Sequence, residues 1–354
     1  MMTTRKGRSS FLKKTLFLLF LSALAVICYW GLEKYRVIFD PNLILHGVEE
    51  AYFFIPTGAT YEDIVRLLEQ NHYLLDKGSF EWVAERKKLR KSIRPGRYLL
   101  KVNMNNNDLI NLLRSGSQVP LQLTFSSVTS REVFAGKVSR QIEADSAEIA
   151  NLLFNSVYLK SINFSLLTWQ ALLIPNTYEF YWNTSAQEFM DRMATEYDVF
   201  WNKSRAELAN DIGLNKIEVA ILASIVQRET TMNDEKPTVA GVYLNRLKKG
   251  MRLEADPTLI YALGDFSITR VLDAHKEIDS PYNTYIHAGL PPGPICTPTI
   301  QSLEAVLNAE KHSYLFFCAR EDFSGYHNFA KTYAKHRINA RKFQRELNKR
   351  RIWK

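Results

Sequence analysis

The chain opens with a long apolar segment, which is followed by alternating strand and helix patterns. Residues 16–32 (LFLLFLSALAVICYWGL) carry no charge and are just long enough for a helix that crosses a membrane. Tyr29 and Trp30 lie at the end of this segment, where aromatic side chains meet the membrane–water interface. The pattern predicts a transmembrane helix over residues 15–33, preceded by a cytoplasmic tail over residues 1–14.

The positive charge before this segment predicts its orientation. Residues 1–14 carry five Lys or Arg side chains and no acid, so the N-terminus should stay in the cytoplasm and the rest should be exported. Cleavage by signal peptidase after Ala25 would leave VICYWGL on the mature protein, and Ile27 is too large for a lipoprotein box ending at Cys28. We therefore expect an uncleaved single-pass anchor in the cytoplasmic (inner) membrane, with an extracytoplasmic or periplasmic catalytic domain.

Residues 34–125 read as a small membrane-proximal α+β module. Strand patterns occur at residues 52–55, 97–102 and 119–125, and helix patterns at residues 61–70, 79–88 and 109–116. Thr60 and Asp108 are the predicted N-caps of the first and last of these helices, and Gly116 is the predicted end of the last.

Residues 126–354 predict a larger α+β domain. The pattern is mostly helical over residues 130–215 and is interrupted by an aromatic segment at residues 172–185. The aromatic side chains there are Tyr178, Phe180, Tyr181 and Trp182. Packing in the core is the preferred interpretation, and a wall that stacks against sugar rings is the alternative.

The segment KIEVAILASIVQRE (residues 216–229) predicts a central buried helix. It is apolar nearly all round as far as Val226, and Glu229 continues the face of Leu222 and Val226. A carboxyl group at that place is partly desolvated, which raises its pKa and suits a general acid near neutral pH. The alternative is a helix-end carboxylate that pairs with Arg228 or a nearby lysine.

The remaining segments predict a frame around this helix. A helix is expected from about Lys236 to Gly250, another begins at Asp256-Pro257-Thr258, and a strand is expected over residues 313–320. Between them, residues 280–298 form a loop rich in proline, glycine and aromatic residues. A long rigid loop of this kind is typical of a binding surface.

Composition and charge narrow the possible functions. The 354 residues suggest about two domains, and a hydrophobic content of 46% allows a sizeable core. The net charge is +9, of which residues 1–14 carry +5 and residues 335–354 carry +8, so the rest of the chain carries −4. Because the central body is mildly acidic, it does not predict a nucleic-acid groove.

Cysteine, histidine and glycine patterns exclude several kinds of chemistry. Cys28, Cys296 and Cys318 lack zinc-binding spacing, and at most Cys296 and Cys318 could pair, although free thiols are expected. The seven histidines show no metal-site spacing, and neither a nucleophile elbow nor a phosphate-binding glycine loop is present. The sequence therefore predicts no metal site and no cofactor.

Four ordered motifs resemble the endolytic murein transglycosylase family, the YceG-like proteins. The motifs are ASIVQRET (223–230), VAGVYLNRLKKGMRLEADPTLIYALG (239–264), YNTYIHAGLPPGPI (282–295) and YLFFCAREDFSGYHNFAKTYAKH (314–336). An anchor followed by a LysM-like module is also the layout of that family. The resemblance implies an α+β protein with a transmembrane helix, a LysM-like module and a catalytic domain built on a buried helix.

The resemblance also implies a reaction. The expected enzyme is a lytic transglycosylase that cleaves the MurNAc-β-1,4-GlcNAc bond of nascent peptidoglycan strands, leaves 1,6-anhydro ends and ends strand elongation. Peptidoglycan synthases are the protein partners it suggests. Glu229 matches the family's catalytic glutamate, and Gln227 stands where family members often carry a second glutamate.

Further polar residues in the motifs are candidates for substrate binding. They are Asn245, Asp256, Tyr282, Asn283 and Tyr285. For each, the alternative is an ordinary cap, turn or core hydrogen bond. No short motif pairs a second acid with Glu229, although Asp234, Glu235, Glu254 and Asp256 are possible partners.

Two other functions stay open at this point. A muramidase would use the same Glu229 with water as the acceptor, and glycosidases of that kind commonly need a second carboxylate. A non-catalytic peptidoglycan-binding scaffold would use the small module and the aromatic segment instead.

Overall fold

The structure is a computed structural model that describes residues 6–268 and 270–350. The chain divides into two compact units, Met1–Leu121 with Tyr181–Asn183, and Gln122–Phe180 with Thr184–Lys354. Both units mix helices with short strands, in agreement with the expected α+β class. The sequence predicted the boundary after residue 125, whereas here Gln122–Phe180 already belongs to the second unit.

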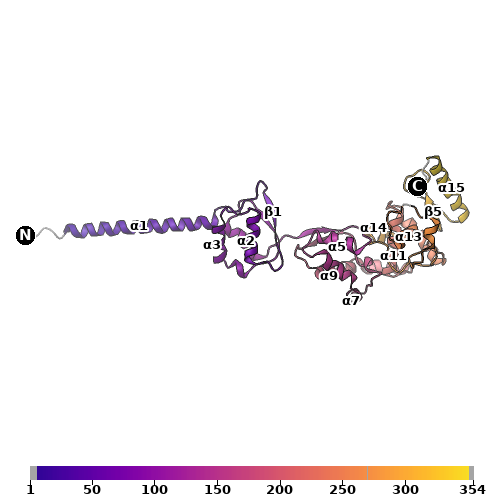
Figure 1. Ribbon diagram of the computed structural model, residues 1–354, viewed down its shortest axis with the longest axis horizontal. Coiled ribbons are helices and arrows are strands. Elements are labelled where there is room, and N and C mark those ends of the chain that lie inside the picture. The colour runs from indigo at the N-terminus through magenta and orange to yellow at the C-terminus, as the bar shows by residue number, and fades with distance from the viewer. Residues whose placement is uncertain (1–5, 269, 351–354) are drawn as a thin grey trace, which may run out of the picture. The chain divides into compact units, whose positions relative to one another are not determined.

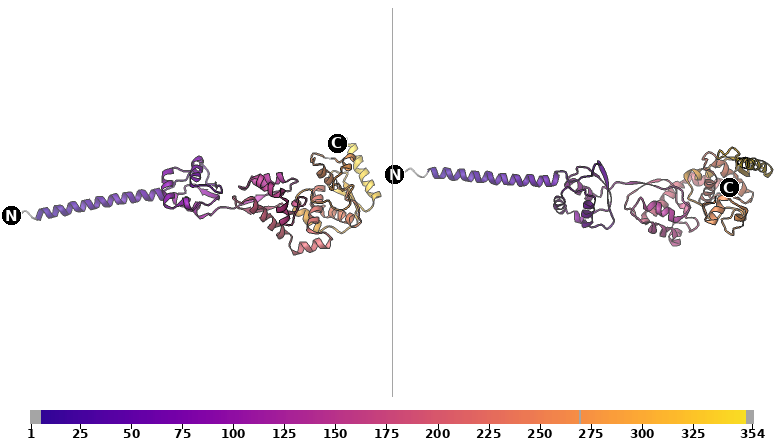
Figure 2. Two further views of the ribbon diagram at one scale, coloured as in Figure 1. Left: turned by 60° about the horizontal axis from the view of Figure 1, so that its bottom comes forward. Right: turned by 45° about the horizontal axis from the view of Figure 1, so that its top comes forward.

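The N-terminal helix α1 (Lys6–Phe39) is one continuous helix that enters the first unit (Figures 1 and 2). Among the described residues, its segment Lys13–Phe39 is the one helix long and apolar enough to cross a membrane. Side chains of residues 13–33 are exposed, whereas Val37 and Ile38 pack against the core of the first unit. The helix therefore continues past the predicted end at residue 33 and becomes part of the module.

The first unit is built around a two-stranded antiparallel sheet, in which Tyr52 lies opposite Leu99. Its elements are β1 (Glu50–Ile55), α2 (Tyr61–Gln70), α3 (Lys77–Arg86), the 3₁₀ turn η1 (Leu89–Lys91), β2 (Gly96–Lys101) and α4 (Asn106–Ser115). The helices cover the sheet with apolar side chains such as Ile64, Phe80 and Leu109, which are fully buried. Its likeness to a LysM module stays a prediction.

The predicted helix ends of this unit are partly confirmed. Thr60 caps α2 in a capping box with Asp63, and Gly116 ends α4 with a φ of 71°, which favours glycine. The prediction that Asp108 caps α4 is wrong. Asn105 is the cap, because its side chain accepts a hydrogen bond from the backbone N–H of Asp108, which itself lies in the first turn.

A buried polar cluster joins α1, α3 and α4 in the first unit. Asn106 donates to the carbonyl of Val37 (2.9 Å) and to Ser79 Oγ (3.0 Å). It also accepts a hydrogen bond from Asn42 Nδ2 at 2.7 Å. Because Asn106 is 1% exposed, these bonds replace water and hold the end of α1 against the module.

The N-terminal half of the second unit is helical, as predicted for residues 130–215. Its elements are β3 (Leu121–Thr124), α5 (Arg131–Ser139), α6 (Ser146–Phe154), α7 (Ser156–Ser161), α8 (Trp169–Leu172), β4 (Thr177–Phe180), α9 (Ala186–Phe200) and α10 (Lys203–Asp211). Strands β3 and β4 form a two-stranded sheet. Tyr178 and Phe180 of the aromatic segment are buried, and Phe180 packs on Phe189, which confirms the core interpretation for these two residues.

The C-terminal half surrounds α11 (Lys216–Glu229). Every residue from Val219 to Val226 is buried, which confirms the prediction of a central buried helix. Helices α12 (Lys236–Lys248), α13 (Asp256–Leu263) and α14 (Ile300–Leu307) pack against it. The other elements of this half are η2 (Asp273–Glu277), β5 (Phe316–Ala319), β6 (His327–Ala330) and α15 (Tyr333–Lys349). Strands β5 and β6 form an antiparallel hairpin that contacts α15. Cys296 and Cys318 are free thiols, as expected.

The Asn106 cluster leads to a stability prediction. Asn106→Ala leaves the Val37 carbonyl and an Asn42 N–H poorly satisfied in a buried place, which should destabilise the first unit by roughly 2–3 kcal/mol. Native-state hydrogen exchange of the α3 and α4 amides measures this change. Asn107→Ala is the matched control, because within the described part of the chain the Asn107 side chain bonds only to the Asp108 carboxylate. Equal destabilisation by both variants would contradict a structural role of the cluster.

Candidate active site

The site is centred on Glu229, the last residue of α11. Helix α11 begins with a capping box between Asn215 and Glu218 and ends because Thr230 adopts an extended backbone. Glu229 therefore lies one turn beyond the fully buried Val226. Its side chain is half-buried and turns toward α12, where Tyr243 donates a hydrogen bond to Glu229 Oε1 at 2.7 Å.

A cavity of about 250 Å³ lies beside this carboxyl group. It is lined by Glu229, Tyr243, Arg246, Leu253, Glu254, Asp256, Tyr285, Phe317 and His336. Two larger hollows, each of about 490 Å³, lie at Tyr61–Lys91 and at Ile162–Ile217 and contain none of these residues. The cavity at Glu229 is the one that joins several of the sequence motifs.

The pKa of Glu229 is raised to about 7. Burial is the main cause, since a carboxylate loses hydration there, and the negative charge of Asp256 adds to it. The hydrogen bond from Tyr243 and the charge of Arg246 act in the opposite direction. Protonated and ionised Glu229 are therefore both well populated at neutral pH.

Tyr243 is the hydrogen-bond donor to the Glu229 carboxyl group. The residue is 1% exposed, and its ring meets Phe317 edge-on at 5.8 Å between centroids. Burial and the negative charge of Glu229 raise the pKa of Tyr243 well above its ordinary value. Its hydroxyl stays protonated, so it donates to the Glu229 carboxylate and stabilises the ionised form.

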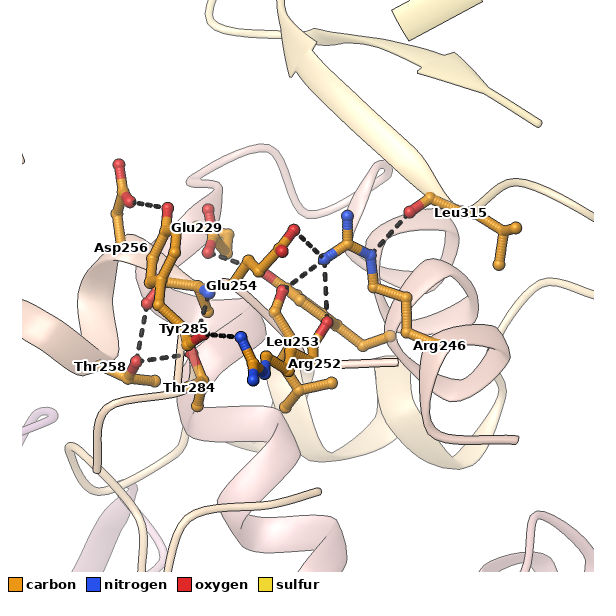
Figure 3. A network of polar contacts seen from close by, with 12 residues as sticks. Glu229, Arg246, Arg252, Leu253, Glu254, Asp256, Thr258, Thr284, Tyr285 and Leu315 are labelled. Carbon is orange, nitrogen blue, oxygen red and sulfur yellow. Dashed lines mark hydrogen bonds and ion pairs between the residues drawn. The ribbon is translucent and has the colours of Figure 1, made fainter. Parts of the chain in front are cut away.

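Arg246 forms hydrogen bonds that connect the loop after α12 to Leu315, which directly precedes strand β5 (Figure 3). Its Nε donates to the carbonyl of Leu315 at 2.7 Å. Its Nη1 donates to the carbonyls of Arg252 (3.0 Å) and Leu253 (2.9 Å) and to Glu254 Oε2 (3.0 Å). Glu254 has a φ of 51°, which is costly for a residue with a side chain, so this clamp holds a strained backbone at the cavity wall.

Asp256 and Tyr285 form the opposite wall. The Tyr285 hydroxyl donates to Asp256 Oδ1, and burial together with that carboxylate raises the pKa of Tyr285. Thr284 joins the two segments, because its Oγ1 accepts from the Ala255 N–H at 3.0 Å and lies 2.9 Å from Thr258 Oγ1. The loop at residues 280–298 and the start of α13 therefore meet at the cavity (Figure 3).

His336 brings the C-terminal helix to the site. Its ring stacks on Phe316 with centroids 5.5 Å apart, and its Nδ1 has no hydrogen-bond partner among the described residues. Burial and the charge of Arg246 lower the pKa of His336, so its imidazole is neutral at pH 7. It can donate or accept one hydrogen bond without adding charge.

The structure brings together three of the predicted site residues and places three elsewhere. Glu229, Asp256 and Tyr285 line the cavity, whereas Asn245, Tyr282 and Asn283 do not. Asn245 donates to the carbonyls of His312 and Tyr314, and the fully buried Asn283 donates to those of Lys276 and Ile278. Tyr282 is 8% exposed and packs on Tyr261. These three side chains shape the loops around the cavity.

Gln227 also lies outside the cavity. Its Nε2 donates to Ser127 Oγ at 2.7 Å, and its Oε1 accepts from the Thr299 N–H at 2.6 Å. The side chain therefore joins α11 to two distant loops. Glu229 is the one acid from the last turn of α11 that lines the cavity.

Several cavity residues were not found by sequence reasoning. They are Tyr243, Arg246, Leu253, Phe317 and His336. Tyr243 and Arg246 stand three positions apart in VYLNRL, so they share a helix face, and a buried Tyr and Arg on one face were a usable signal. Phe317 and His336 gave no such signal. Residues 6–268 and 270–350 contain no group of three or more His, Cys, Asp or Glu side chains that could hold a metal ion.

Comparisons relate the chain to known proteins. A family model described as the YceG-like family matches residues 53–342. An endolytic murein transglycosylase of Bacillus subtilis (strain 168) is 29% identical over 302 residues, which is 80% of this chain and 81% of that protein. One from Streptococcus pneumoniae serotype 2 (strain D39 / NCTC 7466) is 24% identical over 86% of this chain, which covers 60% of that protein. A 2.6 Å crystal structure of a YceG-like protein from Listeria monocytogenes has a TM-score of 0.52 and 28% identity, and covers 82% of this chain and 99% of that one.

The hydrogen bond between Tyr243 and Glu229 predicts a pKa change. Tyr243→Phe removes a donor that stabilises the carboxylate, so the pKa of Glu229 should rise above about 7, by about one unit. Titration of the Glu229 carboxyl carbon by ¹³C NMR measures it. Tyr282→Phe, which removes a buried hydroxyl outside the cavity, should leave this pKa unchanged. An unchanged pKa in Tyr243→Phe would contradict the assignment of this bond.

The raised pKa of Glu229 also predicts how stability depends on pH. The pKa of Glu229 in the folded protein, about 7, lies above its ordinary value of 4.5, so the folded state binds this proton more tightly than the unfolded chain does. The folded state is therefore progressively destabilised relative to the unfolded chain as pH rises from 4.5 through 7. Glu229→Gln removes this destabilisation and should stabilise the protein by roughly 2–3 kcal/mol at pH 8, with little effect at pH 4.

Urea unfolding at the two pH values, followed by near-ultraviolet circular dichroism, measures this difference. Glu207→Gln is the control, because it neutralises an exposed carboxyl on α10. A gain from Glu229→Gln that is equal at pH 4 and pH 8 would show that the burial of charge is not its cause.

Proposed function

The chain belongs to the YceG-like family, and from this premise we propose that it is a membrane-anchored lytic transglycosylase that cleaves peptidoglycan strands. Its relatives in Bacillus subtilis and Streptococcus pneumoniae carry the name endolytic murein transglycosylase. The observation that carries the proposal is the Glu229 carboxyl, with a pKa of about 7, in a cavity lined by the family motifs. A group with that pKa is suited to give and take a proton in one catalytic cycle.

The proposed reaction begins with protonation. Protonated Glu229 gives its proton to the glycosidic oxygen between N-acetylmuramic acid and N-acetylglucosamine. The bond from C1 of the muramic residue to that oxygen breaks, and the N-acetylglucosamine residue leaves with a free 4-hydroxyl group. Positive charge then develops at C1 and the ring oxygen of the muramic residue.

The second step closes a ring within the substrate. Ionised Glu229 removes the proton of the muramic C6 hydroxyl, and O6 forms a bond to C1. The product is a 1,6-anhydro end, no water is consumed, and Glu229 regains its proton. Because acceptor and donor belong to one sugar, the reaction gains the high effective concentration of an intramolecular step and needs no activated water.

The charges around the cavity support this chemistry. Asp256 and Glu254 place carboxylates in the same cavity as Glu229, and negative groups stabilise a developing oxocarbenium ion. Tyr243 favours ionised Glu229 through its hydrogen bond, which assists the first proton transfer. We infer that Asp256 and Tyr285 contact the sugar. Asn245, Tyr282 and Asn283 would act indirectly, by holding the loops around the cavity in place.

The proposed place of action is the outer face of the cytoplasmic membrane. The apolar part of α1 would act as the single-pass anchor, and the basic tail before it would stay in the cytoplasm. The anchor would keep the enzyme near newly made strands and close to the synthases that make them. Cutting inside such strands would end their elongation and set their length.

The same carboxylates favour one alternative function. Glu254 or Asp256 could activate a water molecule that attacks C1, which would make the protein a muramidase. The two reactions differ in one product, because hydrolysis leaves a reducing muramic end that is one water heavier than the anhydro end.

The test uses the full-length protein in detergent, purified glycan strands and mass spectrometry of the products. Wild type should release muramic ends lighter by one water. Glu229→Gln should lower the rate at least about 100-fold, because the amide cannot donate the proton. Glu207→Gln, which changes an exposed carboxyl in the same way, should keep the wild-type rate.

Three outcomes would count against the proposal in different ways. Ends of normal reducing mass would identify a muramidase. Anhydro ends that persist in Glu229→Gln would remove Glu229 from the chemistry. Binding of glycan by folded wild type without any cleavage would support a scaffold role.

A further inference from the structure

Helix α3 runs antiparallel to the end of α1 in the first unit. Its N-cap, Asp76, bonds through its backbone N–H to Asn42 Oδ1 at 2.7 Å. One turn later, Ser79 Oγ accepts a hydrogen bond from Asn106 Nδ2, which also donates to the carbonyl of Val37. After another turn, the ring of Trp82 lies 4.7 Å from Lys34 Nζ. Successive turns of α3 thus contact residues 42, 37 and 34, in an order that approaches the apolar segment of α1. Figure 1 shows α3 beside the end of α1.

This direction places the C-terminal end of α3 at the membrane side of the unit. The uncharged segment of α1 ends at Leu32, only two positions before the residue that touches Trp82. From Trp82 to Arg86, α3 advances by about 6 Å, which corresponds to about four residues of α1. The backbone of Arg86 therefore lies at the level of about residue 30, where Tyr29 and Trp30 mark the expected interface, and its guanidinium turns back over Trp82.

The chain is strongly basic from Arg86 onward. Residues 86–91 (RKKLRK) contain five cations and no acid, and between Trp82 and Lys91 the one acid is Glu85. Arg90 pairs with Glu62, but the described residues contain no carboxylate partner for Lys88 or Lys91. Both side chains are exposed. We name residues 86–91 together with Trp82 the juxtamembrane basic face.

An aromatic side chain completes this face. The guanidinium of Arg86 lies 3.4 Å from the centroid of the Trp82 ring, and Lys34 lies near the same ring. Trp82 is half-buried, with a cation from α1 and one from α3 against it. Tryptophan between cations suits the headgroup region, where its ring is apolar and its surroundings are charged.

We propose that the juxtamembrane basic face binds anionic phospholipid headgroups of the membrane that α1 crosses. The inference rests on the proposed anchoring by α1 and is independent of the proposed reaction. Covalent attachment through α1 keeps the face within reach of the bilayer, and clustered Lys and Arg beside a membrane helix attract anionic lipid. The contact would hold the first unit against the membrane surface.

The test is hydrogen exchange of the full-length protein in nanodiscs. One set contains phosphatidylcholine alone and the other contains 30% phosphatidylglycerol. Amides of residues 86–93 should exchange at least threefold more slowly with phosphatidylglycerol, and 0.5 M salt should remove the difference. The variant Arg86→Gln, Lys88→Asn and Lys91→Gln should also remove it. Asn is chosen at position 88 because the backbone there has a φ of 56°.

Controls separate this contact from net charge, folding and anchoring. Arg337→Gln, Arg341→Gln and Arg345→Gln remove equal charge from α15 and should keep the lipid effect. Exchange of β2 reports that the first unit stays folded, and protection of residues 16–32 in both nanodiscs reports the anchor. Failure of that protection would overturn the anchoring and this inference together.

Two results would overturn the proposal while the anchor holds. Equal exchange of residues 86–93 in both nanodiscs would show that the face does not bind anionic lipid. Slowing by added peptidoglycan fragments in phosphatidylcholine, without any effect of phosphatidylglycerol, would assign the face to glycan instead.

Discussion

The structure of the second unit depends on the burial of one apolar helix, α11, which ends in a carboxyl group. Helix α11 is apolar nearly all round and buried from Val219 to Val226, so it is surrounded by other elements. The same surroundings remove water from Glu229 and raise its pKa to about 7. The cost in stability above neutral pH and the capacity to transfer a proton thus have one physical origin.

The loops around Glu229 are held by buried polar groups that bond to backbone carbonyls. Arg246 reaches three backbone carbonyls and one carboxylate, and it fixes the strained backbone of Glu254. Asn245 and Asn283 act in the same way on neighbouring loops. A guanidinium or amide that is fully hydrogen-bonded in the interior orders its partners, because each lost bond would leave a buried polar group unsatisfied.

The first unit shows how the long apolar N-terminal helix becomes part of a folded module. The last turns of α1 contribute Val37 and Ile38 to the core, and Asn106 bonds to the backbone of that helix. A flexible linker is therefore absent between the described part of α1 and the module. The orientation of α3, and with it the position of the basic residues 86–91, follows from these contacts.

The sequence by itself determined the features that depend on neighbours along the chain. Helical periodicity, the capping box at Thr60, Gly116 and the buried α11 are local, because caps and side-chain spacing act within one or two turns. Even there, the sequence predicted Asp108 as the cap of α4, whereas the backbone places the cap at Asn105. The sequence also made Glu229 a candidate, through its place at the end of an apolar helix and its match to the family's catalytic glutamate.

Only the tertiary structure decided which residues share the cavity with Glu229. Phe317 lies on β5 and His336 on α15, about 90 and about 110 residues after Glu229, so no helical periodicity connects them to α11. Polarity alone could not separate Asp256, which lines the cavity, from Asn283, which is buried in loop hydrogen bonds. Both are polar residues in the motifs that resemble the family, and they differ in where the fold places their side chains.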